Sequence, residues 1–181
     1  MAHALELLIS VGYQGLSMRS LADRCGMSLS NVQYYFRTKE DLICEIADRY
    51  FGECNTVLLT FFEKQGPVEN RNGLHNLVGL FLDHGREMTD MCRVFRELWA
   101  IGTRNDIVAE LLDRHYQRIA ATLIRHMKYP SASPAKLKRM IALFLVISEG
   151  YSIVGRAQPI SHDEATALFT DMLISAAGKT K

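Results

Sequence analysis

The chain has 181 residues, of which 48% are hydrophobic and 23% charged, and its formal net charge is +1 at pH 7. This length suits one large domain or two small ones with a substantial hydrophobic core. The near-neutral charge differs from that of a strongly basic nucleic-acid-binding protein. The longest apolar run, residues 140–147, is far shorter than the ~18 residues that a membrane span needs, so we expect no membrane partner. No basic flank or cleavage site accompanies residues 5–11, which argues against a signal peptide.

Cysteines and catalytic motifs narrow the function further. The four cysteines lie far apart in the sequence, with no C-x-x-C pair, so reduced thiols in the core of a cytoplasmic protein are the simplest interpretation. The sequence holds no G-x-S-x-G, H-E-x-x-H or glycine-rich phosphate-loop motif. His115 and His126 share a helix face but would stand ~16 Å apart, too far for one metal ion. We therefore expect no enzyme, no metal site and no cofactor.

The first predicted elements are an amphipathic helix that ends at Gly12 and a short helix that follows it. The short helix carries Leu21, Ala22 and Cys25 as an apolar stripe at helical spacing. Ala22 is small enough to let two helices cross closely. Gly26 follows where the chain must turn sharply, because glycine adopts a left-handed backbone conformation without steric cost.

The next predicted helix begins after this turn and has two different faces. Ser28 can cap it by accepting a hydrogen bond from a free backbone N–H of the first turn. Val32 and Phe36 lie four residues apart and point to the core. The outer face carries hydrogen-bonding and stacking groups in place of the usual charged mixture: Ser30, Asn31, Gln33, Tyr34 and, just beyond, Lys39. This pattern is typical of a helix-turn-helix whose second helix enters the major groove of DNA. The alternative is a plain helical hairpin with solvated polar groups.

A capping pattern starts the following helix. Thr38 and Asp41 form a T-x-x-D motif, which places a helix N-terminus beside Lys39. A helix N-terminus next to a lysine is a suitable site for a DNA backbone phosphate. The local charge agrees with this interpretation, since residues 19–39 contain a single anion, Asp23, against four cations: Arg19, Arg24, Arg37 and Lys39.

The segment from Gly12 to Leu42 also resembles a known family. Its run GYQGLSMRSLADRCGMSLSNVQYYFRTKEDL is similar to the DNA-binding signature of the TetR (tetracycline-repressor) family. That signature is a glycine-ended helix, S/T-x-x-x-[IL]-A, a glycine turn, and an aromatic-rich helix running into F-x-[ST]-K-E-x-L. The matching positions are Gly12, Leu21, Ala22, Gly26, Ser28, Tyr34, Phe36, Thr38, Lys39, Glu40 and Leu42. The resemblance covers about residues 4 to 50 and implies an all-α regulator that binds operator DNA as a homodimer.

Chemistry assigns base contacts to the predicted second helix of the motif. Asn31 and Gln33 can each offer a donor and an acceptor to an adenine edge, worth ~1–3 kcal/mol of discrimination when bidentate. Tyr34 and Tyr35 can donate to phosphate oxygens, and their rings can touch a thymine methyl group. Gln33 and Tyr35 depart from the tyrosine and histidine that are frequent in the family, so the operator sequence is not predicted.

Contacts to the DNA backbone are predicted on either side of that helix. We expect Ser28, Thr38 and Lys39 to bind phosphates, and Arg19 to bind a guanine or a phosphate. The family's first helix usually begins a turn or two earlier, with basic residues upstream. Either the start site is misassigned or the chain has been shortened, and if this start is the native one we expect phosphate anchoring to be weaker. The complete set of predicted DNA-binding residues is Arg19, Ser28, Ser30, Asn31, Gln33, Tyr34, Tyr35, Thr38 and Lys39.

The rest of the chain is predicted to be helical throughout, because no convincing run of alternating β-branched residues occurs. A long connecting helix runs from about 39 to 64 and is stopped by Gly66 and Pro67. Five further helices are predicted at about 72–88, 90–101, 104–128, 134–156 and 162–177. We expect a helix-turn-helix domain over residues 1–45 and a helical ligand-binding and dimerisation domain over residues 46–181.

The last two predicted helices, about 134–177, are candidates for a dimer interface. Residues 140–147, MIALFLVI, are apolar on every side, and such a helix must be covered all round. We predict a homodimer in which these two helices meet their copies across a two-fold axis as a four-helix bundle. A dimer would also supply the second half-site of a helix-turn-helix protein. The alternative is that both helices fill the core of a monomer.

The resemblance places the pocket for a small-molecule effector, unknown here, in helices 72–128. Candidate lining residues in that region are Phe95, Trp99, His115 and Tyr116. The alternative is that these aromatic side chains belong to the core, as aromatic stripes at helical spacing usually do. Taken together, the sequence predicts a DNA-binding transcriptional regulator, in the simplest case a repressor released by its effector. The alternative function is a helical dimerisation or adaptor protein with weak or lost DNA binding.

Overall fold

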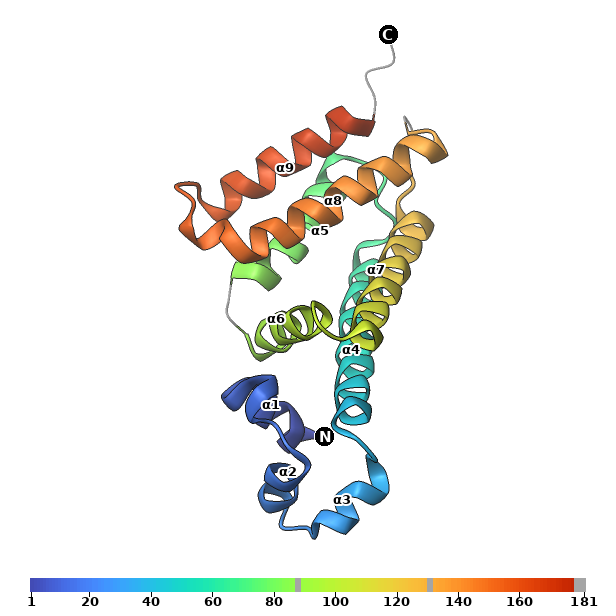
Figure 1. Cartoon of the computed structure of the whole chain (residues 1–181). Coiled ribbons are helices and arrows are strands. Elements are labelled where there is room, and N and C mark those ends of the chain that lie inside the picture. The colour runs from blue at the N-terminus through green and yellow to red at the C-terminus, as the bar shows by residue number, and fades with distance from the viewer. Residues whose placement is uncertain (87–88, 130–131, 178–181) are drawn as a thin grey trace. The chain divides into compact units, whose positions relative to one another are not determined.

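The computed structural model describes residues 1–86, 89–129 and 132–177, and these ranges confirm the all-α prediction. Nine α-helices and one 3-10 turn account for the regular structure of the described residues, with a single isolated bridge between Val68 and Met127 (Figure 1). The chain forms two compact units. Unit 1 contains Met1–Thr56 and Thr89–Tyr116, and unit 2 contains Val57–Met88 and Gln117–Lys181. The predicted division between residues 45 and 46 stays a prediction.

Unit 1 is built around a core of its own. Its elements are α1 (Ala2–Gly15), α2 (Met18–Cys25), α3 (Leu29–Tyr35), the first part of α4 (Lys39–Gln65), α6 (Asp90–Gly102) and the first part of α7 (Asp106–His126). Leu8 of α1, Leu42 of α4 and Leu98 of α6 are fully buried in this core. Figure 1 shows α2 and α3 on the side of α1 that faces away from α6.

The helix-turn-helix forms for the local reasons that its sequence indicates. Ser17 caps α2 by accepting the backbone N–H of Ser20 at 3.0 Å, and the Ser20 hydroxyl accepts from the Ser17 N–H in return. Gly26 ends α2 with φ 63° and ψ 30°, the left-handed conformation that the turn was predicted to need. Ser28 then caps α3 by accepting the backbone N–H of Asn31 at 3.2 Å, as predicted.

The limits of the later helices agree with the sequence prediction to within two residues. The range predicted at 72–88 corresponds to α5 (Arg71–Arg86), and the last two residues of that range lie outside the described part of the chain. The first helix was predicted to end at Gly12, and its regular helical backbone does break at that residue. It continues to Gly15 after a break at Gly12, whose φ of 66° and ψ of 179° are not helical.

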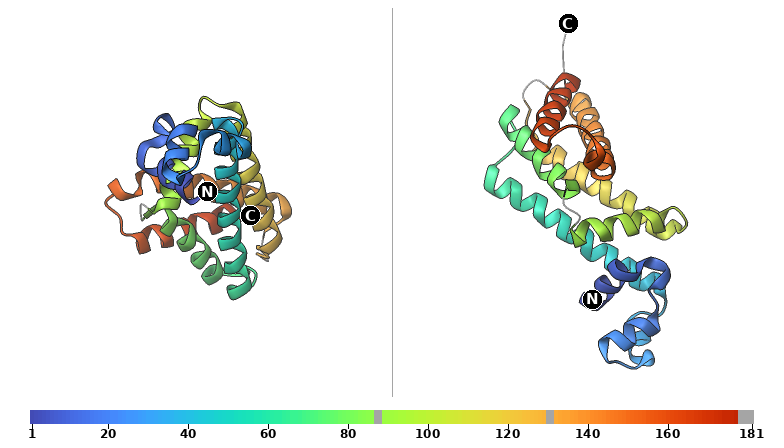
Figure 2. Two further views of the ribbon diagram at one scale, coloured as in Figure 1. Left: turned by 90° about the horizontal axis from the view of Figure 1, so that it is seen from below. Right: turned by 90° about the vertical axis from the view of Figure 1, so that its left-hand side faces the viewer.

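Unit 2 holds the last two helices, which pack with each other and with α5 (Figure 2). They are α8 (Pro134–Val154), followed by a 3-10 turn at Gly155–Ala157, and α9 (His162–Ala177). Ser133 caps α8 ahead of Pro134, and Ser161 caps α9 by accepting the N–H of Glu164 at 3.2 Å. The core of this unit includes the fully buried side chains of Leu74, Leu77, Met140, Phe144, Ala165 and Leu173.

One side of α8 and part of α9 stay uncovered in the single chain. Val146 and Ile153 of α8 are 70% and 68% exposed, and Leu168 and Met172 of α9 are 53% and 41% exposed. By length and composition alone, residues 134–157 would suffice to cross a membrane, which is weak evidence because the core helix of a soluble protein passes the same test. The sequence prediction counted only uninterrupted apolar residues and so missed this segment, because a membrane-spanning helix can include isolated charged residues. The described residues of one chain therefore do not cover α8 on all sides, as such an apolar helix was expected to require.

Candidate nucleic-acid interface

Helix α3 presents its polar side chains to solvent. Val32 is only 3% exposed and holds the helix on the core of unit 1, with Phe36 half-buried one turn later. The predicted base-contacting side chains, Asn31 and Gln33, are exposed on the other face. Because these amides have no role in the interior, α3 has the outward polar face that entry into a DNA groove requires.

Two tyrosines project from the end of α3. Tyr34 is 82% and Tyr35 66% exposed, which are high values for aromatic side chains. Their rings meet edge to face, with centroids 5.4 Å apart and planes at 86°. In this edge-to-face arrangement the two phenol groups point in different directions, and both can donate hydrogen bonds to a ligand. Ser30 is exposed as well, and its hydroxyl lies 3.0 Å from that of Ser28.

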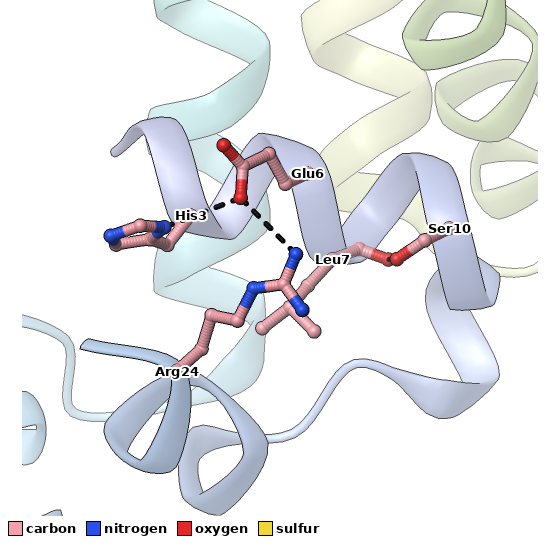
Figure 3. A network of polar contacts seen from close by, with 5 residues as sticks. All are labelled: His3, Glu6, Leu7, Ser10 and Arg24. Carbon is pink, nitrogen blue, oxygen red and sulfur yellow. Dashed lines mark hydrogen bonds and ion pairs between the residues drawn. The ribbon is translucent and has the colours of Figure 1, made fainter. Parts of the chain in front are cut away.

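The arginines near α3 differ in whether they form ion pairs. No ion pair of the described residues involves Arg19 or Arg37, and both are exposed. Arg24 of α2, in contrast, is paired with Glu6 of α1 at 3.3 Å (Figure 3). His3 lies at the same distance from the same carboxylate oxygen, and hydrogen bonds from His3 and then Arg24 lower the pKa of Glu6. Arg24 therefore connects α2 to α1.

The start of α4 has the predicted capping box. The Thr38 hydroxyl accepts the Asp41 N–H at 3.0 Å, and the Asp41 carboxylate accepts the Thr38 N–H at 3.0 Å. Lys39 is half-buried, and its ammonium donates to the backbone carbonyl of Tyr13 and lies 3.9 Å from the centroid of the Tyr13 ring. Burial lowers the pKa of Lys39, and the nearby Glu40 opposes this shift. Sequence reasoning placed Lys39 at the DNA and missed Tyr13 as its partner.

The four candidate pocket residues come together in unit 1. Phe95 and His115 are buried, and His115 stacks on Phe51 of α4 with ring centroids 4.1 Å apart. Trp99 is 46% exposed and donates from Nε1 to the Tyr116 hydroxyl at 3.1 Å. Two of the four side chains thus have the burial and stacking of core residues, while the other two reach the surface. That they line an effector pocket stays a prediction.

Unit 2 contains a cavity that sequence reasoning missed. It has a volume of about 390 Å³ and lies where the chain passes from α8 to α9. Its lining includes Tyr151, Arg156 and His162. His162 also contacts Asp83 of α5, with 3.1 Å between Nε2 and the carboxylate oxygen. Within the described ranges, no group of three or more histidine, cysteine, aspartate or glutamate side chains is placed to hold a metal ion.

Comparisons with known proteins agree with this arrangement. Residues 1–46 match the family described as bacterial regulatory proteins, tetR family. The chain is 37% identical over 171 residues to an HTH-type transcriptional regulator in the dhlA 5′ region of Xanthobacter autotrophicus, covering 94% of this chain and 85% of that protein.

Solved structures share the fold. A transcriptional regulator of Rhodococcus sp. Rha1 superposes with a TM-score of 0.74 at 17% identity, over 99% of this chain and 96% of that one. The multidrug binding protein EbrR in complex with imidazole superposes with a TM-score of 0.73 at 16% identity, over 99% and 93% of the two chains. At these identities the likeness concerns the fold alone.

Proposed function

The chain belongs to the TetR family of transcriptional regulators, whose members bind operator DNA and form dimers, and we propose that it reads its operator with the exposed face of α3. The observation that carries the proposal is the outward polar surface of a helix held in place by Val32 and by its Ser28 cap. Amide side chains exposed on a short helix are suited to base edges in the major groove.

The proposed contact surface combines base recognition with backbone contacts. Asn31 and Gln33 recognise bases, and the phenols of Tyr34 and Tyr35 donate to phosphates or meet a thymine methyl group. The Ser28 and Thr38 hydroxyls accept backbone N–H groups. Thr38 keeps its own proton to donate to a phosphate oxygen, and in the Ser28–Ser30 hydroxyl pair one of the two protons remains for the same use. Arg19, Lys39 and Ser30 complete the surface. Lys39 uses one N–H on the Tyr13 carbonyl, and an ammonium has three.

A second copy of the chain provides a second α3 helix for DNA binding, and we call these two α3 helices the reading helices. The exposed apolar side chains of α8 and α9, among them Val146, Ile153 and Leu168, would be buried by the same face of a partner across a two-fold axis. This homodimer through about residues 134–177 removes apolar surface from water and sets two α3 helices on one duplex.

Control by a small molecule is the final part of the proposal. The protein acts in the cytoplasm as a repressor, and an effector releases it by favouring dimers whose reading helices are spaced wrongly for the operator. The aromatic cluster of Phe95, Trp99, His115 and Tyr116 supports a pocket for an organic effector, and the similar fold of EbrR has been solved with imidazole bound.

A gel shift tests the DNA-binding proposal. Wild-type protein is titrated into duplex that precedes its own gene and into an unrelated duplex of equal length, at low and high salt. We expect a retarded, salt-sensitive complex with preference for the first duplex. Asn31→Ala should remove this preference without weakening binding to the unrelated duplex, while Asn72→Ala, an exposed asparagine of α5, should change neither. No retarded complex at either salt concentration would favour the adaptor alternative.

A further inference from the structure

The break in α1 leaves a backbone donor that the helix itself does not use. At Gly12 the backbone has φ 66° and ψ 179°, a combination that is open almost only to glycine. In an unbroken helix the N–H of Tyr13 would bind the carbonyl four residues earlier. The break prevents this, and an unpaired N–H away from water is costly. Some other group must therefore accept this N–H.

Glu97 of α6 is that acceptor. Its Oε2 lies 3.1 Å from the Tyr13 backbone nitrogen, although the two residues are 84 positions apart in the chain. The carboxylate sits directly over the break, since a Cβ atom added to Gly12 would lie 3.5 Å from Oε2 and 3.6 Å from Oε1. The carboxylate oxygen thus takes the place of the helical carbonyl that the break removes as acceptor.

The carbonyl and the hydroxyl of Tyr13 also contact the start of α4. Its carbonyl accepts the Lys39 ammonium, and its hydroxyl lies 3.2 Å from Oε1 of Glu40. Burial, and then the charge of Glu40, raises the pKa of Tyr13, so the phenol stays protonated as a donor. Three helices of unit 1, namely α1, α4 and α6, thus meet at one residue.

The position of this junction matters for DNA binding. Helices α2 and α3 pack on each other, α2 packs on α1, and α1 packs on α6. Arg24 of α2 adds an ion pair to Glu6 of α1. The direction in which α3 points is therefore set largely through α1, and the C-terminal end of α1 is held on α6 by Glu97.

We propose that Glu97 is a positioning residue for operator binding, which fixes the helix-turn-helix by accepting the Tyr13 N–H at the Gly12 break. This inference rests on the proposed DNA-binding function. Glu97 itself does not touch DNA; it acts through α1.

Two substitutions of Glu97 distinguish a positioning role from a direct effect of its negative charge on DNA binding. Glu97→Gln keeps an oxygen that accepts the N–H but loses the negative charge, whereas Glu97→Ala loses both. If Glu97 acted only by repelling DNA, both variants would bind operator more tightly. Positioning predicts that Glu97→Ala weakens operator affinity about tenfold while Glu97→Gln stays close to wild type. The control Glu110→Ala removes an exposed carboxylate of unit 1 whose ion pair among the described residues is with Arg114 of the same helix, and it should leave affinity unchanged.

The affinities are measured by fluorescence anisotropy on the duplex that precedes the gene, at a temperature where circular dichroism shows every variant fully folded. Hydrogen exchange of the free protein provides a second readout. Exchange at residues 12–16 and through α2 and α3 should quicken in Glu97→Ala but not in Glu97→Gln or Glu110→Ala. Equal operator affinity of wild type and Glu97→Ala, or equal loss in both Glu97 variants, would overturn the inference. A wild-type protein that binds no duplex would instead refute the proposed function on which it rests.

Discussion

Truncating Leu168 tests the proposed dimer quantitatively. This side chain is 53% exposed in the single chain, on the same helix as the buried Leu173 and Ala165. Burying a whole leucine side chain is worth about 1.5–3 kcal/mol, so covering the exposed half contributes roughly 1 kcal/mol. Two-fold symmetry counts this contribution twice, which gives about 2 kcal/mol per dimer and a dissociation constant roughly thirtyfold higher in Leu168→Ala.

Sedimentation equilibrium over a range of concentrations measures this change directly. Ile107 provides a matched control, since it is 54% exposed at the start of α7 in unit 1, whereas α8 and α9 belong to unit 2. Ile107→Ala should leave the dissociation constant as it is in wild type. The reasoning fails if Leu168→Ala dimerises as tightly as wild type, or if the two variants weaken the dimer equally.

Three further predictions concern single residues. Gly26→Ala should lower the free energy of unfolding in urea by about 1 kcal/mol, because the φ of 63° at Gly26 disfavours a side chain. The control Gly52→Ala, within α4, should raise the free energy of unfolding by roughly 0.5–1 kcal/mol. Equal effects of the two substitutions would contradict the role of the turn. Arg19→Ala should reduce the slope of log K against log salt by about 0.9 for each phosphate that Arg19 neutralises, and an unchanged slope would exclude Arg19 as a phosphate contact. Burial lowers the pKa of His84 below its usual 6.5. The neutral form of His84 therefore contributes its full stability above pH 6.5, and this contribution is lost as the pH falls through the pKa of the folded state. His84→Gln should flatten this acid-side decrease in melting temperature, and an unaltered pH profile would show that another group titrates.

The helices and their ends were predictable because local chemistry determines them. Ser28, Gly26 and the Thr38–Asp41 pair act on backbone groups within three or four residues, so their spacing in the sequence carries the information. The exposed face of α3 was predictable for the same reason. Burial of Val32, with Phe36 packed on the same core, orients a seven-residue helix and turns the polar positions outward.

Contacts between distant segments were not predictable in this way. Glu97 and Tyr13 have no sequence spacing that signals their bond, and the break at Gly12 that creates it looked like a simple helix end. Lys39 fits a phosphate contact by its position at a helix N-terminus, yet its ammonium also binds the Tyr13 carbonyl. The aromatic cluster likewise joins residues from α4, α6 and α7, so only packing shows that His115 stacks on Phe51.

Hydroxyl-radical footprinting of the wild-type protein on the duplex that precedes its gene tests the central claim most directly, because it reports both the reading helix and the two-fold arrangement. The account predicts two protected patches on one face of the duplex, with centres one helical turn of about 10 base pairs apart or a multiple of it. Both patches should be lost together in Asn31→Ala at protein concentrations that saturate the wild-type site. A single patch, or two patches that persist unchanged in Asn31→Ala and Tyr34→Ala, would contradict recognition by paired α3 helices.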